Sequence, residues 1–285
     1  MIPNVIRGKQ ITPRRVLLYG THGVGKSSWA AQAPSPIFIP TEDGLADIDC
    51  DKFPLCKFFG DIVNAISILS TEDHSYRTVV LDTLDWAERL IHRDTAQKEG
   101  KGNLEDFGYG KGYTKALDDW DFMLRGFTYL REARGMSVIL LAHAKVERYQ
   151  APEADPYDRY SPDTHKSVSG MLQEWCDEVL FATYRVSTIA KDLGFDRTRT
   201  RAIGTGERVV YTTEMSTHLA KRRVPMPDVL PLDFNVYAAY LVAARGTAPT
   251  VQPQEIKPPE PSNGNGDIEG VVTNGHSKIK EPVNE

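Results

Sequence analysis

A glycine-rich octapeptide near the N-terminus constrains the fold of this chain more than any other feature. It runs Gly20-Thr21-His22-Gly23-Val24-Gly25-Lys26-Ser27 and matches the pattern GxxxxGK followed by Ser. The apolar run VLLY, residues 16–19, precedes it, and a segment compatible with a helix, residues 26–32, follows. A loop of this kind joins a strand to a helix in α/β folds. The sequence therefore predicts an α/β fold organised around a phosphate-binding loop, residues 20–27, called the P-loop below.

The residue types of the P-loop predict a site for ATP and Mg²⁺. Glycines let the backbone curl so that its N–H groups and the helix N-terminus face the phosphates. Lys26 is expected to neutralise phosphate charge and Ser27 to ligate Mg²⁺, whereas His22 is expected to face solvent. The predicted nucleotide-binding residues are Gly20, Thr21, His22, Gly23, Val24, Gly25, Lys26, Ser27 and Ser28.

Strand-like apolar runs alternate with helical stretches over residues 1–245, the predicted ATPase domain. The expected strands are residues 15–19, 36–40, 54–59, 77–81, 137–142 and 178–184. The expected helices are residues 26–32, 62–70, 83–98, 113–134 and 234–244. This alternation predicts a mostly parallel sheet with helices on both faces. Two further runs, residues 198–203 and 208–213, flank Gly204-Thr205-Gly206 and predict a C-terminal β-hairpin.

Composition limits the partners of this chain. The net charge of -5 excludes a protein that coats nucleic acid by bulk positive charge, so DNA contacts would need a local basic patch. The three cysteines form no CxxC pair, which argues against a disulfide framework or a zinc site. No apolar run approaches the roughly 20 residues that cross a bilayer, so we expect a cytoplasmic protein without membrane contact.

The last 40 residues differ in composition from the rest. Residues 246–285 contain no aromatic residue and are rich in Pro, Gly, Asn and acidic side chains. Such a segment buries too little apolar surface to offset its ordering entropy, so we expect a disordered acidic tail. It would dock on a partner, keep DNA off a basic surface, or be a solvated appendage.

Two acids follow predicted strands. Residues 78–81 end in Asp82, which we expect to hold the Mg²⁺ hydration shell, with capping of the next helix as the alternative. Residues 36–40 run into Glu42, which we expect to orient and deprotonate the attacking water. Asp43 is the alternative base, and a loop-capping role is the alternative function. The ends of parallel strands open onto one crevice, so the two acids should meet there.

Several segments together resemble a known family. The P-loop with TEDGLADID, GYGKGY, LLAHAKVERY, PYDRY and EWCDEVLFA, over roughly residues 10–240, resembles phage-type RecA-like ATP-binding proteins, a group that includes RecA-like single-strand annealing proteins. The resemblance implies a RecA-like ATPase whose catalytic glutamate ends the strand after the P-loop helix, as Glu42 does. In AAA+ proteins the catalytic glutamate instead directly follows the aspartate that holds Mg²⁺. Here Thr83 follows Asp82, so the AAA+ pattern is missing.

The resemblance also implies roles for two further residues. His143 follows residues 138–142 where RecA has the Gln that senses γ-phosphate; a purely structural histidine is the alternative. Lys166 stands shortly before residues 178–181, where RecA-like proteins place lysines that reach the nucleotide of the neighbouring subunit. A shared site of this kind implies a head-to-tail ring or filament. Its alternative is a solvated loop lysine. Unlike in RecA, we expect no long N-terminal polymerisation helix and no large C-terminal domain, so we expect ATP binding without strand exchange.

RecA-like proteins hold single-stranded DNA with two loops, and the resemblance places them here at residues 99–112 and 145–170. The first carries Tyr109 and Lys111, which suit base stacking, or simply begins a helix. The second carries Arg159, and a nucleotide lid or a disordered loop competes with DNA binding. A basic stretch is the best candidate for backbone contacts, with a solvated hairpin face as its alternative. It contains Arg197, Arg199, Arg201, Arg208, Lys221, Arg222 and Arg223, of which Arg199, Arg201, Lys221 and Arg222 are the predicted DNA contacts.

These features favour an ATP-hydrolysing RecA-like protein that acts on single-stranded DNA in phage-type recombination or annealing. The expected partners are single-stranded DNA, further copies of the chain and a single-strand-binding protein. Three alternatives stay open. They are a motor or loader ATPase acting on duplex DNA or a protein, a nucleotide-gated DNA-binding module with little turnover, and a small-molecule kinase, for which we find no acceptor site.

Overall fold

The computed structural model describes residues 5–8, 10–153, 155–192 and 198–244. For residues 187–192 and 198–205 it describes the backbone alone. The predicted tail, residues 246–285, and Arg197 lie outside the described residues. Among the described residues, no helix is long and apolar enough to cross a membrane.

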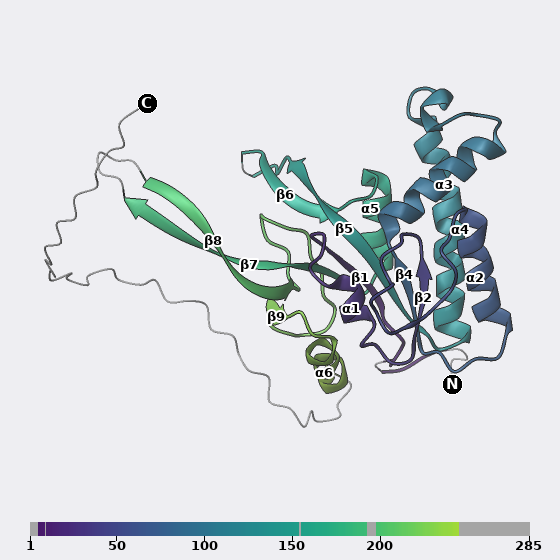
Figure 1. The fold of residues 1–285 in the computed structure, drawn as a ribbon, viewed down its shortest axis with the longest axis horizontal. Coiled ribbons are helices and arrows are strands. Elements are labelled where there is room, and N and C mark those ends of the chain that lie inside the picture. Colours follow the sequence, from purple (N-terminus) through teal and green to yellow (C-terminus); the bar gives the residue numbers. More distant parts are fainter. Residues whose placement is uncertain (1–4, 9, 154, 193–197, 245–285) are drawn as a thin grey trace, which may run out of the picture. The chain divides into compact units, whose positions relative to one another are not determined.

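A nine-stranded sheet forms the centre of the described chain (Figure 1). Its order is β3-β2-β4-β5-β1-β7-β8-β9, and β6 pairs with the outer part of β5. The strands are β1 (Arg15–Gly20), β2 (Pro36–Pro40), β3 (Asp51–Lys52), β4 (Thr78–Asp82), β5 (Ser137–Tyr149), β6 (Tyr157–Pro162), β7 (Glu178–Asp192), β8 (Thr198–Tyr211) and β9 (Val229–Pro231).

Parallel pairing joins β1, β2, β3, β4, β5 and β7, whereas β6, β8 and β9 are antiparallel to their neighbours. The strand that feeds the P-loop, β1, therefore lies between β5 and β7. Its register sets Gly20 beside His143 of β5 and Ala182 of β7. Because the parallel strands share one direction, their carboxyl ends meet at the edge of the sheet that carries the P-loop. The predicted α/β fold class is confirmed.

Helices cover both faces of the sheet (Figure 1). They are α1 (Lys26–Ala30), α2 (Phe59–Thr71), α3 (Leu84–Lys98), α4 (Lys111–Ala133), α5 (Lys166–Trp175) and α6 (Phe234–Ala244), with a 3-10 turn at Leu104–Phe107. Alternate residues of each strand point to opposite faces. Leu17 and Tyr19 of β1 thus join the core beneath α2, α3 and α4, while Val16 and Leu18 join the core beneath α1 and α6.

The expected helices are all present, and α4 buries Trp120, Leu124, Phe127 and Leu130 on the stripe expected from their spacing. One expected strand is wrong. Residues 54–59 form no strand; the outer neighbour of β2 is the two-residue β3, and Phe59 already begins α2. The backbone still bonds to β2 on both sides of Pro54, from the N–H of Phe53 to the carbonyl of Phe38 and from that of Cys56 to the carbonyl of Pro40, but it forms no regular ladder.

The expected hairpin at Gly204-Thr205-Gly206 is also wrong. β8 runs through these residues without turning and pairs with β7 along its length. The register shifts between Tyr184 and Val186, and Gly206, with φ of 75°, absorbs the extra residues on β8. The glycines therefore mark a bulge instead of a turn. In Figure 1, β7 and β8 continue past the sheet as a two-stranded ribbon.

Residues 145–170 are not the loop that we expected. β5 does not end at Ala142 but continues to Tyr149, and β6 folds back on it with Ala144 paired to Pro162. The helix α5 then begins at Lys166. Exposure alternates along this extension, with Val146 and Arg148 exposed and Glu147 and Tyr149 half-buried, as expected for a strand with one covered face.

Candidate active site

The P-loop has a shape that only its glycines allow. Gly23 and Gly25 have φ of 71° and 104°, a region that side-chain-bearing residues rarely adopt. A β-carbon on Gly20 would lie 2.1 Å from the carbonyl oxygen of Ala182, so β7 leaves no room for a side chain there. Val24 is buried and anchors the loop, and α1 begins directly at Lys26. The loop is a concave strand-to-helix turn, and this shape fits a phosphate group.

The Lys26 side chain is buried beneath the P-loop. Its Nζ donates hydrogen bonds of 3.2 Å to the carbonyl oxygens of Gly20 and Thr21. Burial lowers the pKa of the Lys26 ammonium, and the nearby Asp82 carboxylate opposes that shift. A partly desolvated cation at this position suits a phosphate ligand.

Ser27 and Asp82 form the predicted metal-binding pair. The Ser27 hydroxyl donates a hydrogen bond of 2.7 Å to Oδ2 of Asp82. The other carboxylate oxygen, Oδ1, is buried and has no hydrogen-bond partner among the described residues. Burial raises the pKa of Asp82, and the bond from Ser27 and the charge of Lys26 oppose the shift. A buried, unpartnered carboxylate oxygen beside a serine hydroxyl fits a hard cation such as Mg²⁺.

Glu42, His143 and Asp85 lie together beside the P-loop. The His143 ring Nδ1 lies 3.0 Å from Oδ2 of Asp85, and its Nε2 lies 3.9 Å from Oε1 of Glu42. The backbone N–H of His143 donates to Asp85 as well. Asp85 therefore fixes both the backbone and the ring of His143, with the ring edge turned toward Glu42.

The electrostatics of the two acids differ. Burial raises the pKa of the Glu42 carboxyl, and His143 partly opposes this shift. Burial alone would raise the pKa of Asp85 too, but its hydrogen bonds with His143 and Thr83 bring that pKa below its usual value. Asp85 is thus the fixed anion, and Glu42 is the stronger base. Asp43, the alternative base, is exposed.

Glu42 is positioned by a clamp between β2 and β4. The Thr41 hydroxyl donates to the Thr83 carbonyl and accepts from the Thr83 N–H, each at 2.7 Å. The Thr41 N–H also donates to the carbonyl of Asp82. The two acid-bearing strand ends are therefore held together, as their positions after strands predicted.

His22 is exposed, as expected, but it also has a partner. Its ring stacks on that of His143 with centroids 3.8 Å apart. Burial and the neighbouring His143 lower the pKa of His22. This contact was not predictable from the sequence, because residues 22 and 143 follow different strands.

Asp85 is the site residue that we missed in the sequence. It stands in the first turn of α3, where an acid usually serves the helix dipole. Its burial, at 6% exposure, was the missing information. The spacing Asp82-Thr83-Leu84-Asp85 was a weak signal, since it places a second acid three residues after the first.

The predicted DNA contacts of the first loop are accessible. Tyr109 is fully exposed between Gly108 and Gly110, both of which have positive φ. Lys111 follows as the first residue of α4 and is exposed. Lys166, predicted to reach a neighbouring subunit, is likewise exposed at the start of α5.

The other predicted DNA contacts do not form one patch. Arg159 stacks on Tyr149 and pairs with Glu147 and Glu214. Lys221 donates to the carbonyls of Gln173 and Cys176, which end α5.

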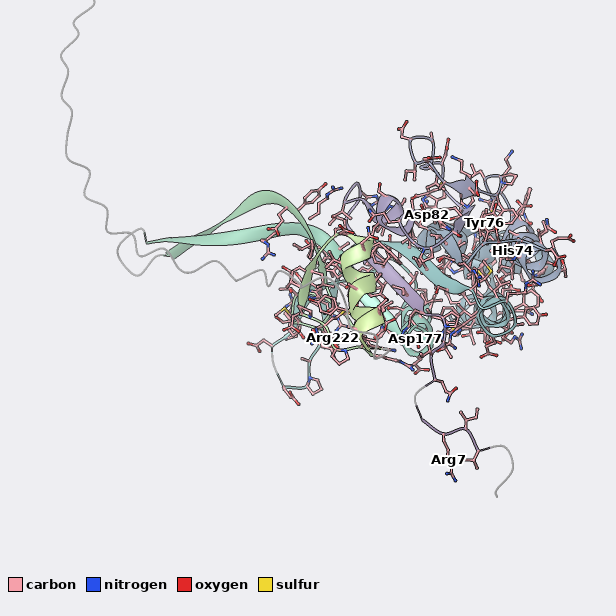
Figure 2. The ribbon with its side chains drawn as sticks, turned by 90° about the horizontal axis from the view of Figure 1, so that it is seen from below. Arg7, His74, Tyr76, Asp82, Asp177 and Arg222 are labelled. Carbon is pink, nitrogen blue, oxygen red and sulfur yellow. The ribbon has the colours of Figure 1, made fainter. Side chains whose placement is uncertain are left out.

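Arg222 pairs with Asp228 and lies well apart from Asp82 (Figure 2). Arg199 and Arg201 are on β8, opposite Lys191 and Ile189 of the ribbon, and their side chains lie outside the described residues. Lys221 pairs with Val179 of β7, which stands ten residues before Ile189, the partner of Arg201. At ~3.3 Å per residue, this spacing separates Lys221 from Arg201 by about 30 Å along β7.

Comparison with known families agrees with this geometry. The model of a family described as an AAA domain matches residues 12–224. The chain belongs to the AAA domain family. In this chain Thr83 directly follows Asp82, and the glutamate near the P-loop is Glu42.

Solved structures show a weaker likeness. A crystal structure of the RadB recombinase is 14% identical, covers 70% of this chain and 80% of its own, and has a TM-score of 0.40. No curated protein matches this sequence. The family match and the P-loop geometry together identify a nucleotide-binding P-loop ATPase.

Proposed function

We propose that this AAA domain protein hydrolyses ATP with Mg²⁺ and acts on single-stranded DNA in recombination or annealing. The placement of Glu42, just past the end of β2, against the His143–Asp85 pair beside the P-loop carries the proposal. A carboxylate held beside a phosphate-binding loop is what in-line attack by water requires.

Each residue of the site has a role in this proposal. The P-loop amides and Lys26 hold the phosphates, and Ser27 and Asp82 hold Mg²⁺, which when bound neutralises charge on the β- and γ-phosphates. Glu42, 26% exposed, is open to water and accepts its proton. His143, fixed by Asp85, contacts both Glu42 and the P-loop residue His22 and reports the state of the nucleotide.

A line of contacts leads from this site to the candidate DNA loop, residues 99–112. Asp85 and Glu88 lie one turn apart on α3, and the Glu88 carboxylate accepts the backbone N–H of His165 at 2.9 Å. The His165 ring stacks on Tyr113 with centroids 4.6 Å apart. Tyr113 belongs to the first turn of α4, two residues after Lys111.

This line supports coupling between DNA and ATP. The Tyr113 hydroxyl also donates to Glu105 within the loop, so a change in the loop is transmitted to Tyr113. Exposed Tyr109 on two flexible glycines suits stacking with an unpaired base. DNA bound there would act on the α3–α4–α5 contacts that adjoin Asp85.

ATPase rates measured without DNA, with single-stranded DNA and with duplex of the same length test the proposal. We expect single-stranded DNA to give the highest rate, Tyr109→Ala to remove the stimulation, and Lys26→Ala to be inactive throughout. Stimulation by duplex alone would favour a motor or loader. DNA binding without turnover would favour a nucleotide-gated module.

A further inference from the structure

Arg208 of β8 lies against the P-loop, although we grouped it by sequence with the basic DNA-binding stretch. A β-carbon on Gly25 would stand 2.9 Å from Nη1 and 3.9 Å from Cζ of Arg208. Gly25 directly precedes Lys26 and has φ of 104°. The guanidinium therefore lies over the part of the loop whose amides face the phosphates.

The register of the ribbon explains this position. Arg208 is paired with Tyr184 of β7, just before the bulge. Directly opposed residues of an antiparallel pair project from the same face. The Tyr184 hydroxyl donates a 3.2 Å hydrogen bond to the carbonyl of Gly23, so this face of the ribbon rests on the P-loop at two points.

The guanidinium of Arg208 has no hydrogen-bond or ion-pair partner among the described residues, and the side chain is exposed. Other arginines of the chain are paired: Arg222 with Asp228, Arg159 with Glu214 and Arg15 with Asp177. Around the P-loop, three carboxylates face Lys26, which come from Asp82, Glu42 and Asp85. A second cation is therefore available at a site whose ligand carries several negative charges.

We propose that Arg208 contacts the phosphates of the nucleotide bound by its own P-loop, as a cis-acting arginine supplied by the β7–β8 ribbon. The inference rests on the proposed ATP site but assigns it a residue outside every P-loop motif. Arginine suits this position because its planar donors reach phosphate oxygens in pairs. The same contact makes the ribbon sensitive to whether nucleotide is present, since Tyr184 and Arg208 adjoin the bulge.

The test is equilibrium binding of a fluorescent ATP analogue with Mg²⁺. Arg208→Met keeps the aliphatic stem and should weaken binding on the order of tenfold or more, the loss of one or two charged hydrogen bonds. Arg208→Lys should lose less. Arg125→Ala removes an exposed arginine on α4, on the other face of the sheet from α1, and should change nothing. Without nucleotide, the wild type and the variants should have equal unfolding temperatures. If Arg208→Met has a lower unfolding temperature than the wild type, Arg208→Gln is used to repeat the test.

Controls separate this inference from the proposed function. If the wild type binds no ATP analogue, the ATP site itself is wrong. If the wild type binds, Lys26→Ala does not, and Arg208→Met binds as the wild type does, the role of Arg208 is overturned. Binding of a single-stranded oligonucleotide without ATP should be unchanged in Arg208→Met. If Arg208→Met loses affinity for the oligonucleotide but keeps its affinity for ATP, Arg208 is a DNA-binding residue and the proposal is wrong.

Discussion

The Ser27 hydroxyl donates a 2.7 Å hydrogen bond to the Asp82 carboxylate, joining the first turn of α1 to the end of β4. The two residues are 55 positions apart in the sequence. In the sheet, β5 lies between β4, which ends at Asp82, and β1, which leads into the P-loop. This bond leaves the second Asp82 oxygen buried and without a described partner. This arrangement fits the proposal that the two residues share a cation.

Asp82→Asn should weaken the response to Mg²⁺. The amide oxygen still accepts from Ser27, so the loop keeps its anchor, but the negative charge near the cation is lost. The Mg²⁺ concentration for half-maximal ATPase activity should rise roughly 10- to 100-fold. A titration of activity against Mg²⁺ measures this, and an unchanged midpoint would remove Asp82 from the metal site.

Lys26→Ala should weaken ATP binding on the order of 100-fold or more, because the buried ammonium is the main positive charge beneath the P-loop. Lys57→Ala, an exposed lysine before α2, is the matched control and should bind normally. Isothermal titration with ATP measures both. Equal affinity in the two variants would contradict the placement of the phosphates.

Sequence and structure agree where a pattern fixes a strand end. The P-loop, Asp82 and Glu42 were predictable because each follows an apolar run, and the ends of parallel strands converge. Asp85 was not, because its role depends on burial against His143, from a strand 58 residues later. The positions of the basic residues predicted to bind DNA were not predictable from the sequence either. Their positions depend on the β7–β8 register, and Gly204-Thr205-Gly206 misled because glycines serve bulges as well as turns.

Glu88 should make stability fall as pH rises. Burial raises the pKa of its carboxyl from 4.5 to about 7. The folded state thus binds the proton more tightly, and the stabilisation, complete below pH 4.5, is lost as pH rises through 7. Glu88→Gln removes this dependence while keeping an acceptor for His165.

Between pH 5 and 8, the free energy of unfolding should fall by about 2 to 3 kcal/mol more in the wild type than in Glu88→Gln. Urea unfolding at the two pH values measures the difference. His92, whose pKa burial lowers to about 4, is present in both proteins and changes stability in the opposite direction. Parallel pH profiles for the two proteins would show that Glu88 ionises normally.

Lys166 tests whether active sites are shared. We propose that this exposed residue reaches the γ-phosphate of a neighbouring subunit, so Lys166→Ala should bind ATP but hydrolyse it slowly. Mixing Lys166→Ala with Lys26→Ala creates interfaces with one intact P-loop and one intact Lys166, and part of the activity should return. Activity should also rise faster than linearly with protein concentration. A fully active Lys166→Ala, or a mixture without activity, would leave it a solvated lysine.

Glu42 carries the central claim that this site hydrolyses ATP. The most direct measurement compares wild type, Glu42→Gln and Asp43→Asn for ATP affinity and for turnover at saturating ATP and Mg²⁺. We predict that all three bind ATP alike, that Asp43→Asn turns over normally, and that Glu42→Gln is slower by roughly 10² to 10⁴, the contribution of a positioned general base. Normal turnover by Glu42→Gln would contradict the account.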